Sequence, residues 1–257
     1  MTEYTDHHGP EGLLVRGTVV VVPGRGETRA TYGRFGRRLA ADAYRVRVVD
    51  APRPDPDDPE GALTRFAALV ADAVAGAAGA EGVAEPVVLV GADAGAAAVA
   101  ALLARPEPFL PAGRPHAVVL AGLPGPDTAF TGGGWDDELD ARTSCPAHRG
   151  TLTGDEQVRR GSLGEPVPEA LLDAAYGGDI AVPVLLLAGD ADPLADHPAL
   201  ARLAKALPKA RLSVVRGAHH DVLNDLQHRS VAAEVVTFLE TLRNELRPLV
   251  AVESSAW

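Results

Sequence analysis

The chain has 257 residues, enough for one large α/β domain or two small ones. Hydrophobic residues make up 46% and charged residues 23%, a balance typical of a folded globular protein rather than a disordered one. The formal net charge of −11 argues against nucleic acid and anionic membrane surfaces as partners, because phosphate binding depends on clustered lysine and arginine.

Strand-like and helix-like segments then alternate along the chain. Short β-branched runs bounded by glycine or proline predict strands, and longer runs with apolar residues three or four apart predict helices. In chain order we expect strands over residues 17–24, 44–50, 87–91, 116–122, 182–189 and 211–217, with helices over 32–43, 61–78, 94–104, 169–177, 198–206 and 228–243. This alternation predicts an α/β fold with a mostly parallel sheet and helices on both faces.

One long connection, residues 124–178, interrupts the alternation and is rich in glycine, proline and charge. A connection of this length inside a compact domain is expected to have its own structure or to cover a site. We therefore expect a core formed by residues 13–123 and 179–250, with a lid or cap at 124–178. The ends, residues 1–12 and 251–257, show no periodicity and are expected to be flexible.

A single cysteine, Cys145, rules out an intrachain disulfide and a zinc site made of several cysteines. The first dozen residues lack the basic and apolar regions of a signal peptide, and no apolar run reaches the ~20 residues that span a bilayer. We therefore expect a cytoplasmic protein that acts on a small molecule without a cofactor or metal. The oligomeric state does not follow from the sequence.

Three polar positions follow predicted strands. Asp93 lies in "GADAG", Asp192 in "AGDADPLAD", and the pair His219 and His220 in "GAHHDVLND". Functional residues of open parallel sheets gather where the strands end at their carboxyl side. The chain order of nucleophile, acid and histidine is that of the α/β-hydrolases.

The sequence resembles α/β-hydrolases of the lysophospholipase-like or monoglyceride-lipase-like branch. The stretch "PGRGETRATY" is similar to the HGxGE loop of that branch, "GADAG" takes the place of the GxSxG nucleophile turn, and "GDADPL" that of the acid loop. Two positions depart from the pattern: Pro23 stands where a histidine is usual, and Asp93 stands where the serine nucleophile is usual.

The resemblance implies a role for each matched position. Asp93 would be the nucleophile, Asp192 the acid that pairs with the histidine, and His220 the base. The backbone N–H groups of Arg25 and Ala94 would form the oxyanion hole, and residues 124–178 would be the lid. His220 is preferred because the histidine of this branch lies three residues after the loop glycine.

An aspartate at the nucleophile position changes the expected chemistry. Its usual pKa of about 3.9 leaves it ionised at pH 7, and the start of a helix favours an anion. Attack on an ester carbonyl would give a high-energy mixed anhydride, whereas attack on an sp3 carbon gives an alkyl ester that water activated by His220 can hydrolyse. This is the chemistry of epoxide hydrolases and haloalkane dehalogenases.

The leaving group distinguishes these two reactions. Opening an epoxide needs a proton donor, for which Tyr176 in the lid and Tyr32 beside the first loop are candidates. Typical dehalogenases carry a tryptophan directly after the aspartate, but Ala94 stands there, and Trp135 in the lid is the remaining candidate. We therefore predict an epoxide substrate in preference to a carbon–halogen bond.

Several alternatives remain open. Asp93 is also suited to cap the helix that follows it, which would make the protein a non-covalent lyase or cyclase, or a non-catalytic binding protein. An esterase that tolerates the aspartate is a further possibility. Asp190 competes with Asp192 for the acid role, and His219 competes with His220.

Two other patterns are weaker. The "GRGETR" loop with Asp50 resembles a dinucleotide-binding loop, but Arg29 replaces its third glycine. Cys145 and His148 are three residues apart, yet two ligands without a further cluster do not make a metal site. The abundance of Ala, Arg, Gly and Pro suggests a bacterial source of high GC content.

Overall fold

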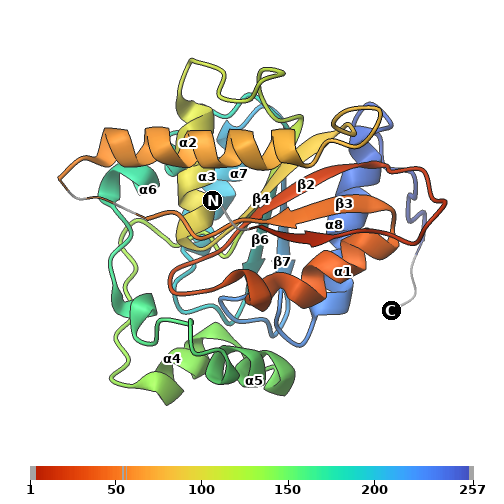
Figure 1. The fold of residues 1–257 in the computed structure, drawn as a ribbon. Helices are drawn as coiled ribbons and strands as arrows, with labels where there is room; N and C mark the ends of the chain where they lie inside the picture. The colour runs from red at the N-terminus through yellow and green to blue at the C-terminus, as the bar shows by residue number, and fades with distance from the viewer. Residues whose placement is uncertain (1–3, 54, 56, 255–257) are drawn as a thin grey trace.

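The computed structural model describes residues 4–53, 55 and 57–254. Its centre is a seven-stranded sheet of order β1-β3-β2-β4-β5-β6-β7 (Figure 1). The strands are β1 (Thr5–His7), β2 (Gly17–Val22), β3 (Tyr44–Val48), β4 (Val87–Ala92), β5 (Ala117–Ala121), β6 (Val184–Gly189) and β7 (Ala210–Val215). All neighbouring strands are parallel except β1, which pairs antiparallel with β3. The predicted mostly parallel sheet is confirmed.

The central strands are hydrophobic on both sides because helices cover both faces of the sheet. In β2, Val19 and Val21 belong to one buried cluster, while Val20 and Val22 belong to the cluster on the opposite face. Successive side chains of a strand point to opposite faces, so an unbroken run of valines suits a doubly covered sheet. The valines of β2 therefore contribute alternately to the apolar clusters on the two faces of the sheet.

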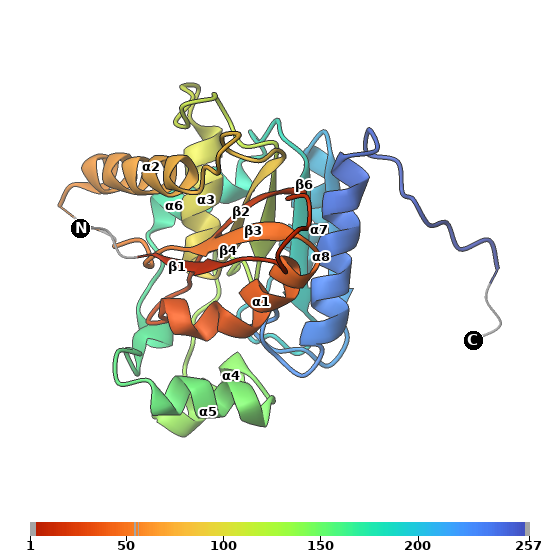
Figure 2. The ribbon, with the colours of Figure 1, turned by 45° about the vertical axis from the view of Figure 1, so that its right-hand side comes forward.

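Helices are divided between the two faces. Helices α1 (Gly33–Ala41) and α8 (His228–Leu242) pack on one face, and α2 (Pro59–Gly76), α3 (Ala94–Ala104), α6 (Glu169–Tyr176) and α7 (His197–Ala206) pack on the other. Figure 2 shows α1 and α8 on the side of the sheet away from α2 and α3. This arrangement leaves the loops at the carboxyl ends of the strands free to form a site.

Residues 124–178 divide into two parts. Helix α4 (Trp135–Arg142), helix α5 (Pro146–Gly154) and the 3-10 turn η2 (Ser162–Gly164) form a small layer apart from the sheet, which we call the cap (Figures 1 and 2). The cap has its own small apolar cluster around Leu139 and Leu152. The remaining helix, α6, packs against α3 through Leu172 and Ala175, so it belongs to the layers that cover the sheet.

The N-terminal segment differs from the sequence-based expectation. Residues 5–7 form β1 at the edge of the sheet, held by pairing with β3 and by the ion pair between Asp6 and Arg47 at 2.6 Å. The expected flexible ends also include residues 1–3 and 255–257, which lie outside the described residues. Within the described part of the chain, no helix is long and apolar enough to cross a membrane.

Candidate active site

Asp93 occupies a sharp turn between β4 and α3. Its backbone has φ 48° and ψ −124°, a conformation that side-chain-bearing residues rarely adopt and that marks functional sites. The flanking glycines allow this turn: a Cβ at Gly91 would lie 2.6 Å from the Cα of Ala96, and one at Gly95 would lie 2.4 Å from the carbonyl oxygen of Pro23. The "GADAG" pattern therefore has a steric origin, and it presents Asp93 at the rim of the sheet.

His220 lies between two carboxylates. Its Nδ1 is 3.0 and 3.1 Å from the two carboxylate oxygens of Asp192, and its Nε2 is 3.1 Å from Oδ1 of Asp93. The Nε2 contact is an ion-pair contact rather than an aligned hydrogen bond. Asp192 is fixed in turn by the backbone N–H of Leu194, which donates to its Oδ1 at 2.8 Å. The three residues that the sequence analysis selected therefore meet in one buried group.

The two competing residues lie elsewhere. Asp190 is exposed and accepts a hydrogen bond from the backbone N–H of Gly217. The Nδ1 of His219 lies 3.0 Å from Asp225, which also accepts hydrogen bonds from Thr143 and Ser144 of the chain between α4 and α5. In this structure Asp192 and His220 therefore contact each other, whereas Asp190 and His219 take other partners.

The backbone of Arg25 lies where the sequence analysis expects an oxyanion-hole donor. Its N–H donates to Oδ2 of Asp93 at 2.7 Å. Ala94 is the first residue of α3, so its N–H is one of the helix-start donors that have no acceptor within the helix. The second carboxylate oxygen of Asp93 is thus held by a backbone donor, while the first faces His220.

The side chain of Arg25 is a feature that sequence reasoning missed. Its Nε and Nη2 donate to the carboxylate of Asp93 at 2.7–3.1 Å, and its Nη1 donates to the carbonyl oxygens of Leu163 in η2 and of Glu165 directly after it. Both partners are nearly buried, with side-chain exposures of 10% and 3%. The only available signal was a long cationic side chain at the variable position of the first loop.

These contacts set the charges of the resting site. Burial alone would raise the pKa of Asp93, but the Arg25 guanidinium and His220 outweigh it and hold this pKa well below its usual range. Burial alone would lower the pKa of His220, but Asp192 and Asp93 outweigh it and raise this pKa to about 10. At neutral pH the site therefore holds an ionised Asp93 beside a protonated His220.

Little free space remains beside these groups. A cavity of about 10 Å³ borders Asp93, His220, Tyr32 and Asn224, which is the space of one water molecule. The side-chain oxygen Oδ1 of Asn224 is buried and has no hydrogen-bond partner among the described residues. A substrate larger than water thus requires the groups that line this cavity to move.

The three candidate leaving-group donors lie in different places. Tyr32 borders the cavity, and its hydroxyl donates to Glu27. The hydroxyl of Tyr176 donates to the carbonyl oxygen of Pro124 at 3.1 Å, and Nε1 of Trp135 donates to Thr153 at 3.4 Å within the cap. The structure therefore brings Tyr32 to the site and gives Tyr176 and Trp135 other contacts.

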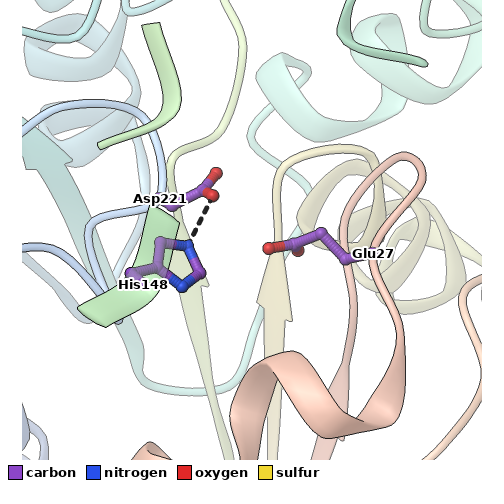
Figure 3. A group of neighbouring side chains, drawn as sticks. All are labelled: Glu27, His148 and Asp221. Carbon is purple, nitrogen blue, oxygen red and sulfur yellow. Dashed lines mark hydrogen bonds and ion pairs between the residues drawn. The ribbon is translucent and has the colours of Figure 1, made fainter. Parts of the chain in front are cut away.

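A second buried group of ionisable side chains adjoins the first. Glu27, His148 and Asp221 have candidate ligand atoms within 4.8 Å of one another, so this group could hold a metal ion (Figure 3). Burial and the nearby Asp221 raise the pKa of Glu27 to about 7. The sequence analysis paired His148 with Cys145, but in the structure Nε2 of His148 lies 2.8 Å from Asp221.

Comparison with known proteins identifies the family of this chain. The profile of the Alpha/beta hydrolase family matches residues 19–235, which include all three members of the Asp93 group. The chain belongs to this family. The α/β-hydrolase core therefore replaces the dinucleotide-binding alternative, and Asp50 forms an ion pair with Arg29 at 3.2 Å.

Solved structures of similar fold include lipases and an esterase. A monoglyceride lipase of Saccharomyces cerevisiae, bound to a substrate analog, has a TM-score of 0.71 and 17% identity over 93% of this chain and 91% of that one. A monoacylglycerol lipase of Paleococcus ferrophilus has a TM-score of 0.68 and 18% identity over 94% and 99%. A Bacillus subtilis carboxylesterase has a TM-score of 0.63 and 16% identity over 93% and 88%. At these identities the likeness concerns the fold, and no curated protein sequence matches significantly.

Proposed function

We propose that this family member is a hydrolase in which Asp93 attacks an electrophilic sp3 carbon of a small organic substrate, with an epoxide preferred. The observation that carries the proposal is that the two oxygens of the Asp93 carboxylate have different neighbours. Oδ2 accepts a hydrogen bond from the backbone N–H of Arg25, while Oδ1 faces Nε2 of His220. The substrate partner is a small molecule, and the proposed location is the cytoplasm.

The first step opens the epoxide ring. Oδ1 of Asp93 bonds to the ring carbon, the carbon–oxygen bond breaks, and the oxygen takes the proton held on Nε2 of His220. This step uses the charge state of the resting site, in which His220 is protonated between two carboxylates. It leaves a neutral imidazole and an alkyl ester on Asp93.

The second step hydrolyses that ester. With Asp93 neutralised, one of the two anions that raise the pKa of His220 is gone, so the imidazole can act as a base. It takes a proton from water, and the hydroxide adds to the Asp93 carbonyl carbon. The N–H of Arg25 stabilises the oxyanion. Collapse releases the product alkoxide, which takes the proton left on Asp93 and restores the carboxylate beside a protonated His220.

The protonated state of His220 favours an epoxide substrate over a substrate with a carbon–halogen bond. A halide leaves without needing a proton, so His220 would remain protonated and could not activate water until it lost that proton. An epoxide consumes the proton in the first step and leaves His220 in the form that the second step needs. The protonated His220 thus favours an epoxide, and this argument does not depend on a tyrosine as the proton donor.

A second candidate function follows from the Arg25 side chain. A guanidinium that binds both oxygens of a carboxylate withdraws it from attack, as in a structural ion pair. If Arg25 stays in place with ligand bound, Asp93 is not a nucleophile, and the protein is a non-covalent lyase or cyclase, or a binding protein without turnover. An esterase, the activity of the similar Bacillus subtilis carboxylesterase, is the third possibility.

The decisive experiment is a single turnover in oxygen-18 water with excess enzyme, with each member of a panel of epoxides, haloalkanes and p-nitrophenyl esters. The proposal expects oxygen-18 in the peptide that contains Asp93, because water adds to its carbonyl carbon. Turnover of an epoxide with label only in the product would favour the non-covalent candidate. The matched control is Asp190→Asn, which changes an exposed carboxylate beside Asp192 and is expected to leave labelling intact.

A further inference from the structure

A group of three buried residues, Glu27, His148 and Asp221, takes no part in the proposed reaction. They come from three separate segments: the loop after β2, helix α5 of the cap, and the loop that carries His220. Their exposures are 7%, 2% and 9%. Figure 3 shows the carboxylate of Glu27 directed toward the other two side chains.

The buried charges around this group do not balance. Glu138 is also buried, and its Oε1 accepts from Arg142 at 2.9 Å, while Oδ1 of Asp221 lies 3.4 Å from the same guanidinium. Among described contacts, Arg142 is the one arginine or lysine that pairs with these carboxylates. Glu138 and Asp221 thus share one guanidinium, and Glu27 contacts no arginine or lysine among the described contacts. By contrast, Asp93 has both Arg25 and His220 as partners. Buried charge without a counter-charge is costly, so a cation would stabilise this group.

One oxygen of the group lacks any partner. Oε2 of Glu27 accepts from the backbone N–H of Gly24 at 2.9 Å and from the hydroxyl of Tyr32. Its Oε1 is buried and has no hydrogen-bond partner within the described part of the chain. Buried carboxylate oxygens are almost always satisfied, so this oxygen indicates a ligand that the protein itself does not supply.

We propose that Glu27, His148 and Asp221 bind a divalent transition-metal ion of the Zn²⁺ or Mn²⁺ type. Two carboxylates and one imidazole are the mixed oxygen and nitrogen donors that such ions accept. Because the candidate ligand atoms lie within 4.8 Å of one another, one point lies within about 3 Å of all three. A contraction of about 1 Å or less reaches the usual 2.0–2.2 Å ligand distances.

The two carboxylate oxygens of Asp221 have different partners, and one of these contacts can accommodate the ion. Its Oδ1 faces Arg142, and its Oδ2 faces Nε2 of His148 at 2.8 Å. An ion would take the place of the proton in this last contact and draw in Glu27. It would join the cap to the loops on either side of the active site, so binding would favour the folded state and hold α5 in position.

The test uses the full chain after treatment with EDTA and dialysis, titrated with Zn²⁺ in a calorimeter and heated with and without Zn²⁺. We expect one ion per chain with a Kd below about 10 μM and a higher Tm in Zn²⁺. Glu27→Gln and His148→Gln should each weaken binding at least about 10-fold and remove the Tm rise. Mg²⁺ should bind far more weakly because of the imidazole ligand.

The control variant is His8→Gln, since His7 and His8 could bind Zn²⁺ at the surface. His8 is exposed and outside the group, so its replacement should leave the Kd unchanged. No saturable binding by the folded wild-type chain, or binding equally strong in both group variants, overturns the proposal. If one group variant fails to fold by circular dichroism, the other decides the result. Neither readout depends on catalysis, so the outcome is independent of the Asp93 mechanism.

Discussion

Arg25 binds the carboxylate of Asp93 twice over, with its backbone N–H on Oδ2 and its guanidinium on both oxygens. The same guanidinium also donates to the carbonyl oxygens of Leu163 and Glu165. One residue thus gives Asp93 a backbone donor and a counter-ion and links it to residues 163–165. Opening that segment and freeing Asp93 for attack are therefore expected to be one event.

Asp93→Asn tests the covalent route. The amide keeps the size of the side chain but removes the charge that attacks carbon, so epoxide turnover is expected to fall by about 10³-fold or more. Steady-state kinetics on the best substrate of the panel measure this loss. If Asp93→Asn retains near-normal turnover of any panel substrate, Asp93 is a helix cap or spectator in that reaction.

Arg25→Gln tests the counter-ion. Without the guanidinium the pKa of Asp93 rises, so the acid limb of the pH–rate profile should move to higher pH. The backbone N–H of residue 25 remains, so the variant should keep measurable activity. Arg159→Gln is the matched control, because this exposed arginine pairs only with Glu165 beside the same carbonyl oxygen. An unchanged acid limb would show that the ion pair does not govern ionisation of Asp93.

His220 should be charged at neutral pH in the free protein. Its pKa is raised to about 10 when folded, against about 6.5 when unfolded. Its contribution to the free energy of unfolding is thus fully present below about pH 6.5 and is lost as the pH rises toward 10. NMR titration of the ring nitrogens measures the pKa directly, and Asp192→Asn should lower it. A ring that is neutral at pH 7.5 in the wild type contradicts the proposed first step.

Gly95→Ala tests the steric basis of the turn. The added Cβ would lie 2.4 Å from the backbone oxygen of Pro23, so the variant should lose about 1–3 kcal/mol of unfolding free energy. Urea denaturation measures the change. Gly150→Ala is the control, since Gly150 is exposed on helix α5 and a Cβ there would meet no atom outside its own stretch of helix. This variant should be neutral or stabilising by up to about 1 kcal/mol. Equal effects at both sites would refute the steric explanation.

The local sequence pattern was sufficient to predict most of the strands and helices. The β-branched runs predict β2 to β7 to within two residues at each end, and the predicted helices match α1, α2, α3, α6, α7 and α8 equally closely. Strand β1 and the two cap helices, α4 and α5, were missed. Strand β1 has three residues and exists only because β3 pairs with it. Helix α4, "WDDELDAR", has too few apolar residues to show a helical period, and its burial comes from the cap around it.

The sequence by itself determined the α/β architecture and the order of Asp93, Asp192 and His220, because periodicity and turn chemistry are local properties of the chain. Only the tertiary structure decided which charges meet. Arg25 reaches Asp93 across 68 positions, and His148 reaches Asp221 across 73. Such distant pairs cannot be seen in local periodicity, because their contact depends on where the loops meet in the folded protein. These contacts in turn set the pKa of each group.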